Sequence, residues 1–171
     1  MLEARPVDRE TVTDLIRLRV REDQMDLIAS NAATIAQAAY EPHAWLRGLW
    51  VGKTPVGLIA MVDFGAEAAE AATSRASQEQ TGADAEPPWP ENAAYLWRLM
   101  IDAKHQGRGY GRAAIEMAFA QARRWGRETF CLHVADHEES ALPFYRRYGL
   151  APTGRIDDGE HFVTGPVPKR P

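Results

Sequence analysis

The stretch Gln106-Gly107-Arg108-Gly109-Tyr110-Gly111 carries three glycines at alternate positions. It follows an apolar run at 94–101 that is typical of a β-strand, and a helical pattern follows it. Glycines leave backbone N–H groups uncovered, and the start of a helix presents unpaired N–H groups with a partial positive charge. The sequence therefore predicts a phosphate-binding turn between a strand and a helix.

Basic residues surround this turn. Lys104, Arg108 and Arg112 lie within a few positions of the glycines, although the 171-residue chain has a formal net charge of −4. A local positive cluster on an acidic protein favours a bound polyanion over an ordinary solvated loop. The spacing differs from the dinucleotide-binding fingerprint, and no Gly-Lys-Ser/Thr ends the stretch as in a Walker loop.

Length and composition narrow the class of protein. The chain is long enough for one domain with a substantial core, so we expect a single domain over 1–171. The acidic balance argues against nucleic-acid binding. No apolar run reaches membrane-spanning length, and residues 1–5 lack the apolar region of a signal peptide. Cys131 lies in an apolar run, which indicates a reduced core cysteine in a cytoplasmic protein.

Turn signals and hydrophobic periodicity predict the other elements. Strands are expected at 2–7, 46–51, 55–64, 94–101, 129–135, 151–156 and 160–167, and helices at 10–20, 31–40, from the glycine turn to Gly126, and 140–148. The helix after the turn has one buried face, formed by Ile115, Ala118, Phe119, Ala122 and Trp125. The strand, helix and strand around it imply a right-handed parallel crossover. Residues 65–92 are expected to form a flexible surface insertion.

Together with SALPFYRRYGL at 140–150, this order of elements resembles the GNAT superfamily of acetyl-CoA-dependent N-acetyltransferases. QGRGYG at 106–111 matches the family's pyrophosphate signature, Arg/Gln-x-x-Gly-x-Gly/Ala, and YRRYGL at 145–150 matches its tyrosine helix. The resemblance covers nearly the whole chain. It implies a single-domain α/β fold whose mixed, mostly antiparallel sheet has about seven strands, is splayed between the fourth and fifth, and is flanked by helices.

A finer resemblance is to the bacterial spermine/spermidine acetyltransferase branch. It rests on EDQMDLIASN at 22–31, AQAAY at 36–40 and YLWRLMID at 95–102. The same stretches fit an inherited scaffold in a relative that acetylates another amine. The branch implies a polyamine acceptor such as spermidine or spermine; the alternatives are a protein N-terminus, an amino acid or an aminoglycoside.

The resemblance implies acetyl-CoA as co-substrate and no metal. The main chain of Met100 and Ile101 would pair with the pantetheine arm, and an N–H there would bind the thioester carbonyl. Glu138 stands where the family commonly has an Asn that contacts the cofactor arm, and a carboxylate cannot donate that hydrogen bond. The remaining expected cofactor contacts lie in the turn and at the helix start: Gln106, Gly107, Arg108, Gly109, Tyr110, Gly111 and Arg112.

Tyr145 is the predicted catalytic residue. When an amine attacks the thioester, coenzyme A leaves as a thiolate, and a nearby phenol can give it a proton. The competing interpretation is a buried aromatic of a short helix, like its neighbours Phe144 and Tyr148. The family motif favours the acid role.

The general base is less clear from the sequence. Many relatives carry a Glu on the central strand, but no carboxylate occurs between positions 91 and 102, and Trp97 falls about where some polyamine acetyltransferases have it. The base is then an ordered water, a carboxylate from elsewhere such as Glu22 or Asp23, or His133 on the next strand. For His133 a structural, hydrogen-bonded role is the favoured interpretation.

Two acidic groups are expected to wall the acceptor cleft, because the family usually builds it from these two regions. They would attract an amine or a polyamine cation, although solvated charged loops are the alternative interpretation. The first group is Glu22, Asp23 and Asp26, and the second is Asp157, Asp158 and Glu160. Trp97 or Trp45 would add a cation–π face.

Arg98 opposes a polyamine acceptor, because its charge would repel the substrate. Strand alternation puts Arg98 opposite Trp97, so only one of the two is expected to face the acceptor. A function of another class also stays open, a non-catalytic acyl-CoA-binding sensor, which the missing strand carboxylate and Glu138 favour. Family members are often dimers, so a homodimer is an expectation.

Overall fold

A computed structural model describes residues 1–66, 68–70, 90, 92–138 and 140–169. Seven strands form one sheet in the order β1-β2-β3-β4-β5-β7-β6. Neighbouring strands are antiparallel except β4 and β5, which run parallel, so the predicted mixed sheet and crossover are confirmed. The strands are β1 (Leu2–Pro6), β2 (Ala44–Val51), β3 (Thr54–Asp63), β4 (Ala93–Ile101), β5 (Thr129–Ala135), β6 (Ala151–Asp157) and β7 (Glu160–Pro166).

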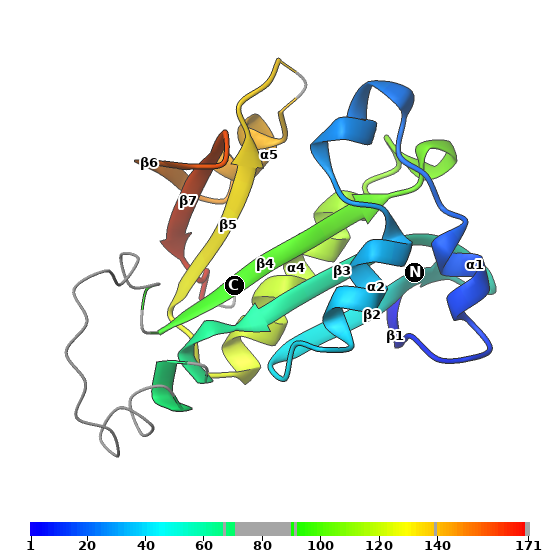
Figure 1. Ribbon diagram of the computed structural model, residues 1–171, viewed down its shortest axis with the longest axis horizontal. Coiled ribbons are helices and arrows are strands. Elements are labelled where there is room, and N and C mark those ends of the chain that lie inside the picture. Colours follow the sequence, from blue (N-terminus) through cyan, green and yellow to red (C-terminus); the bar gives the residue numbers. More distant parts are fainter. Residues whose placement is uncertain (67, 71–89, 91, 139, 170–171) are drawn as a thin grey trace.

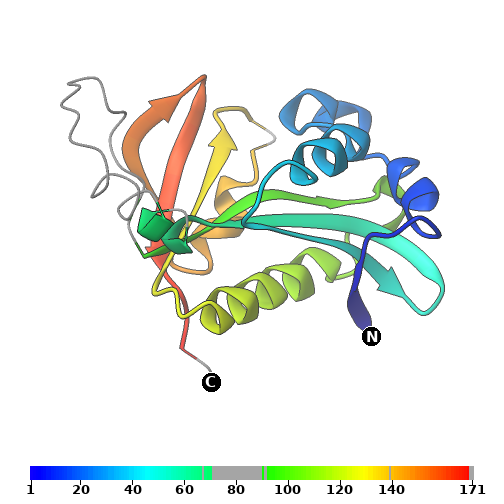
Figure 2. The ribbon, with the colours of Figure 1, turned by 60° about the horizontal axis from the view of Figure 1, so that its bottom comes forward.

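Helices cover both faces of the sheet. The long α4 lies along one face, and α1 and α2 lie on the other (Figures 1 and 2). None of the helices in the described part of the chain has the length and apolar character needed to cross a bilayer. The helices are α1 (Val12–Ile16), the 3₁₀ helix η1 (Glu22–Leu27), α2 (Asn31–Ala38), the 3₁₀ helix η2 (Ala103–His105), α4 (Tyr110–Arg124) and α5 (Leu142–Arg146).

Two sequence predictions differ from the structure or lie outside it. Residues 65, 66 and 68–70 of the predicted insertion are helical, and its residues 67, 71–89 and 91 lie outside the described residues. The first helix ends at Ile16 rather than near Val20. The reason is tertiary: the N–H and C=O groups of Arg19 bond to Asp102 and Ala103 instead of continuing the helix.

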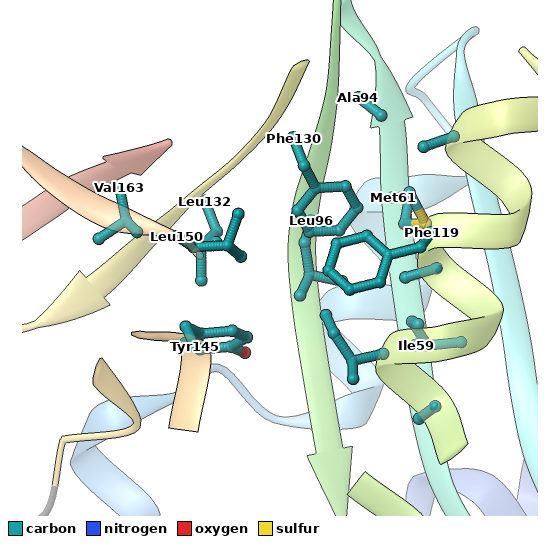
Figure 3. Close-up of a cluster of buried hydrophobic side chains, with 14 of the residues drawn as sticks. Ile59, Met61, Ala94, Leu96, Phe119, Phe130, Leu132, Tyr145, Leu150 and Val163 are labelled. Atoms are coloured by element: carbon teal, nitrogen blue, oxygen red, sulfur yellow. The ribbon is translucent and has the colours of Figure 1, made fainter. Parts of the chain in front are cut away.

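The main core lies between α4 and the sheet. Ile115, Ala118, Phe119 and Ala122 are buried there, which confirms the predicted helix face. Phe119 meets Phe130 of β5 edge to face with ring centroids 4.7 Å apart, an arrangement that aromatic pairs prefer. Figure 3 shows both rings between α4 and the strands. This packing anchors α4, and with it the glycine turn at its start.

The sheet opens between β4 and β5. Their parallel register runs from Ala93–Thr129 to Leu96–Leu132 and ends there. Beyond it, β5 continues its pairing with β7, and the two central strands diverge (Figure 1). The predicted splay between the fourth and fifth strands is confirmed. The second half of β4 therefore presents one backbone edge to the opening.

A β-bulge in β4 changes which side chains share a face. Ala60 of β3 pairs with Arg98 and Met61 pairs with Leu96, so Trp97 is the extra residue. The guanidinium carbon of Arg98 lies 5.2 Å from the centroid of the Trp97 ring, and Nη2 of Arg98 bonds to Oε1 of Gln37 in α2 at 3.5 Å. The expectation that only one of Trp97 and Arg98 can face the acceptor side is therefore wrong, because the bulge breaks the alternation.

Candidate active site

A cavity of about 680 Å³ fills the opening between β4 and β5. Residues 95–101 of β4 and 132–135 of β5 form its sides. The glycine turn lines one end of the cavity. Residues 24 and 26–29, in and just after η1, line its acceptor end. Tyr145 of α5 and Glu160 of β7 also line the cavity, together with Val20, His105, Ser140, Ala141 and Phe144. One space thus connects the segments that the sequence singled out for cofactor, catalysis and acceptor.

The glycine turn presents open backbone to this cavity. A Cβ atom added at Gly107, Gly109 or Gly111 would meet no atom within 4 Å, and all three residues line the cavity. Gly109 is the N-cap of α4 with φ of 80°, a conformation that favours glycine. The first helical amides after it lack intrahelical partners in any α-helix. A pyrophosphate therefore fits this turn sterically and electrostatically.

Most of the predicted cofactor residues meet at this end of the cavity. Arg108, Arg112 and Glu138 are exposed and do not belong to the described residues that line it. The side chain of Gln106 has structural bonds that the sequence did not indicate: its Nε2 donates to Oε1 of Gln24 at 2.7 Å and to the Ile101 carbonyl at 3.0 Å. The predicted residues that do line the cavity are Met100, Ile101, Gln106, Gly107, Gly109, Tyr110 and Gly111.

Tyr145 lies where the cavity meets the core. Its side chain packs beside Leu132 and Leu150 (Figure 3), and its ring centroid lies 5.2 Å from that of Phe144. Only 7% of the residue is exposed, yet it lines the cavity. Burial raises the pKa of the Tyr145 phenol well above its usual range, so the hydroxyl keeps its proton at neutral pH. Both the core and the cavity interpretations of Tyr145 therefore apply.

A hydrogen-bonded chain crosses the acceptor side of the cavity. Nε2 of His133 lies 2.9 Å from Oδ2 of Asp157, and Nδ1 of His133 lies 2.9 Å from the Tyr95 hydroxyl. Because a carboxylate only accepts, Nε2 carries a proton, and when the ring holds no second proton Nδ1 accepts from the Tyr95 hydroxyl. Tyr95 and His133 line the cavity, and Asp157 does not belong to the described lining residues. Both ring nitrogens of His133 have partners and the ring also lines the cavity, so the structural and the proton-transfer interpretations of His133 both apply.

The pKa values of the two outer residues of this hydrogen-bonded group, Asp157 and Tyr95, are both shifted. Hydrogen bonds from Arg155 and then from His133 hold the pKa of Asp157 below its usual value, so Asp157 is ionised at neutral pH. Burial, above all, raises the pKa of Tyr95 well above its usual range. Sequence reasoning missed Tyr95, because only the register of β4 against β5 places its hydroxyl beside His133.

The acceptor end carries two of the predicted carboxylates. Asp26 and Glu160 line the cavity from opposite segments, η1 and β7. Glu22, Asp23 and Asp158 do not belong to the described lining residues. Nη2 of Arg21 lies 2.8 Å from Oδ2 of Asp23, and this bond lowers the pKa of Asp23. The negative charge at the cavity therefore comes from Asp26 and Glu160, and not from Glu22 and Asp23.

Trp97 and Arg98 both line the cavity. The guanidinium carbon of Arg98 lies 5.2 Å from the centroid of the Trp97 ring. This cation–π contact places a positive charge beside the aromatic surface. Among the residues that the structure describes, no group of three His, Cys, Asp or Glu side chains is arranged to hold a metal ion.

Part of the chain is similar in sequence to known proteins. Two Bacillus subtilis (strain 168) proteins, the uncharacterized N-acetyltransferases YdgE and YycN, are 30% and 29% identical to the chain over 69 residues. Each match covers 40% of this chain and 44% of the relative, so the chain spans less than half the length of these curated relatives.

Solved structures share the fold over nearly the whole chain. An acetyltransferase from Thermus thermophilus matches with a TM-score of 0.70 at 20% identity, covering 97% of both chains. PaiA N-acetyltransferase from Thermoplasma acidophilum, in complex with coenzyme A, matches with a TM-score of 0.64 at 16% identity, covering 97% of this chain and 99% of that one. The model of the acetyltransferase (GNAT) family matches residues 10–150. The chain therefore belongs to the acetyltransferase (GNAT) family.

Proposed function

We propose that this protein transfers an acetyl group from acetyl-CoA to a primary amine by direct attack. The observation that carries the proposal is the continuity of the cavity. It runs from the open backbone of the glycine turn, past Tyr145, to Tyr95 and His133 on the other side of the β4–β5 opening. Such a space can hold a phosphate-bearing thioester at one end and an amine at the other.

At the cofactor end, the amides of residues 107–112 would hold the pyrophosphate, with the exposed Lys104, Arg108 and Arg112 adding positive charge. The edge of β4 at Met100 and Ile101 would pair with the pantetheine arm, because the register with β5 has ended before this point. When bound, acetyl-CoA supplies the activated thioester. The chain itself orients that thioester and supplies proton transfer.

Tyr145 would act as the general acid of the reaction. The amine nitrogen forms a bond to the thioester carbonyl carbon, the carbon–sulfur bond breaks, and the sulfur leaves with the electron pair. Tyr145 would give this sulfur its proton, which its raised pKa keeps available. The products are the acetylated amine and coenzyme A as a thiol.

The proton lost by the amine needs an acceptor. The hydrogen-bonded residues Tyr95, His133 and Asp157 would provide it. The raised pKa of Tyr95 keeps its hydroxyl protonated at neutral pH, so no phenolate is present to act as the base, and the proton would pass through the Tyr95 hydroxyl to Nδ1 of His133. Asp157 would stabilise the imidazolium that forms, since it lies 2.9 Å from Nε2. This route replaces the strand carboxylate that β4 lacks.

For the acceptor we propose a polyamine such as spermidine. Asp26 and Glu160 support it, because they bring negative charge to the cavity from two sides. Trp97 adds an aromatic surface, over which the Arg98 guanidinium already lies. A second candidate is an amine that also carries a carboxylate, such as an amino acid, and the specific observation in its favour is Arg98 at the same cavity. We also propose that the protein acts in the cytoplasm.

A panel of acceptors tests the proposal. Purified protein is incubated with acetyl-CoA and spermidine, propylamine, an amino acid, an aminoglycoside or a peptide with a free N-terminus, and release of the coenzyme A thiol is followed. Spermidine should give the highest kcat/KM. A preference for another amine would leave the acetyltransferase and remove the polyamine. Binding of acetyl-CoA without turnover across the panel would instead support a sensor.

A further inference from the structure

Asp102, the first residue after β4, carries a buried carboxylate that holds two distant segments together. The residue is 8% exposed. Its Oδ1 accepts a hydrogen bond from the Arg19 amide at 3.1 Å. Its Oδ2 accepts from the Lys104 amide at 3.2 Å and lies 3.1 Å from Nδ1 of His105. A buried charge is stable only with such partners, so Asp102 constrains both segments strongly.

Further bonds join the same two segments. The Ala103 amide donates to the Arg19 carbonyl at 2.8 Å, and Nε2 of Gln106 donates to Oε1 of Gln24 at 2.7 Å. One segment, residues 102–106, leads directly into the glycine turn. The other, residues 19–24, leads into the part of η1 that lies over the acceptor end of the cavity. The cofactor loop and the acceptor wall are therefore bonded to each other.

The acceptor wall depends on these bonds for its position. None of the residues of η1, Glu22–Leu27, is buried, so packing alone holds this 3₁₀ helix weakly. Segments with few buried contacts open at low free energy unless hydrogen bonds at their ends restrain them. The bonds to Asp102 and Gln106 restrain its N-terminal end.

We propose that Asp102 is a positioning residue that couples the two substrate sites. When coenzyme A or acetyl-CoA fixes the glycine turn, Asp102 transmits that constraint to residues 19–27 and sets the acceptor wall. The inference rests on the proposed function, since it assigns the cofactor to the glycine turn. Coupling is reciprocal, so the amine strengthens coenzyme A binding by the same factor as the coenzyme strengthens amine binding.

Hydrogen exchange tests this proposal without knowledge of the acceptor. Coenzyme A is added to the wild-type protein and to Asp102→Asn, and amide protection is followed at residues 19–27 and 110–112. The Asn side chain turns one acceptor oxygen into a donor, so the Arg19 or Lys104 amide loses its partner. In the wild type both regions should gain protection. In Asp102→Asn only residues 110–112 should gain it.

A matched control separates coupling from a general loss of stability. Asp63 is also 8% exposed, and its Oδ1 lies 2.6 Å from Nε of Arg127, but it does not belong to the described residues that line the cavity. Asp63→Asn should lower the melting temperature and keep the protection gained at residues 19–27. Gln24→Leu is the second variant, should Asp102→Asn fail to fold. It removes the bond to Gln106 and changes one side chain of the acceptor wall, and it should reduce the protection gained at residues 19–27.

Kinetics give a second measurement. Asp102→Asn should raise the KM of the preferred amine roughly fivefold or more, within the usual range of such coupling, with less than a twofold change in coenzyme A affinity measured without amine. Equal protection of residues 19–27 in wild type and Asp102→Asn, or the same loss in Asp63→Asn, overturns the inference. No binding of coenzyme A to the wild type overturns the proposed function itself, and the inference with it.

Discussion

The Tyr95 hydroxyl of β4 lies at hydrogen-bond distance, 2.9 Å, from Nδ1 of His133 on the parallel strand β5. The two residues are thirty-eight positions apart in the sequence, and they meet just where the register of these strands ends. Their contact lies on the acceptor side of the cavity, opposite the core side that holds Tyr145. The opening in the sheet thus separates the proposed proton acceptor from the proposed proton donor.

His133→Gln should lower kcat/KM for the preferred amine by roughly 10²-fold or more, because removal of a proton acceptor has an effect of this order. Acetyl-CoA affinity, measured by calorimetry, should stay within about twofold if the glycine turn is intact. His161→Gln is the matched control: Nε2 of His161 lies 3.3 Å from Oδ1 of Asp136, and this residue is not among the described lining residues. An equal loss in both variants would assign His133 a structural role only.

Tyr145→Phe should lower kcat by roughly 10²–10⁴-fold with little change in acetyl-CoA affinity, since it removes one hydroxyl and almost no volume. Single-turnover measurements keep the chemical step visible. Tyr148→Phe serves as control, because Tyr148 lies in the same segment, packs on Phe144 and does not belong to the described lining residues. An unchanged chemical rate in Tyr145→Phe would remove this residue from the mechanism.

The pH dependence follows from the amine and from Tyr145. The attacking amine must lose its proton, so kcat/KM should rise from neutral toward alkaline pH. Burial raises the pKa of Tyr145, so the acid form persists past about pH 10, where an ordinary phenol ionises. The unfolded chain releases this proton first, and stability should therefore fall above about pH 10, less steeply in Tyr145→Phe. An alkaline decline in rate near pH 8 that is absent in Tyr145→Phe would contradict this assignment.

Gly109→Val should weaken acetyl-CoA binding by roughly tenfold or more, which corresponds to about 1.4 kcal/mol, less than one charge-assisted hydrogen bond can contribute. Any side chain at φ of 80° is strained, and here it also covers the amides that would hold the phosphates. Gly126→Val introduces the same kind of strain at φ of 72°, at the far end of α4. It should cost similar stability and leave acetyl-CoA affinity unchanged. Equal affinities in both variants would exclude the phosphate role.

Asp26→Asn combined with Glu160→Gln should raise the spermidine KM roughly three- to tenfold, if each exposed ion pair contributes about 0.3–0.7 kcal/mol. The KM of propylamine should change less, and added salt should shrink the difference by screening. Glu22→Gln combined with Asp23→Asn is the comparison, because the described lining of the cavity does not include these two residues. A larger rise of the spermidine KM in the Glu22 and Asp23 double variant would mean that these two carboxylates, and not Asp26 and Glu160, bind the acceptor.

Several features follow from the sequence alone because local chemistry decides them. Gly109 marks a positive φ before a helix, and the repeat of Ile115, Phe119 and Ala122 marks the face that this helix buries. These signals depend on neighbours within a few residues. The order of elements, the glycine turn, the parallel crossover and the family resemblance were therefore predictable. So was the position of Tyr145 on a short helix near the turn.

The contents of the acceptor side depend on contacts between segments far apart in the chain. The bulge that places Trp97 and Arg98 on one face arises from the pairing of β4 with β3, and no pattern within β4 reveals it. Tyr95, His133 and Asp157 meet only through the registers of four strands, β4, β5, β7 and β6. Backbone periodicity is a local property, whereas register is set by the packing of the whole sheet. The sequence by itself determined the frame and the cofactor turn, and only the tertiary structure decided which side chains surround the acceptor.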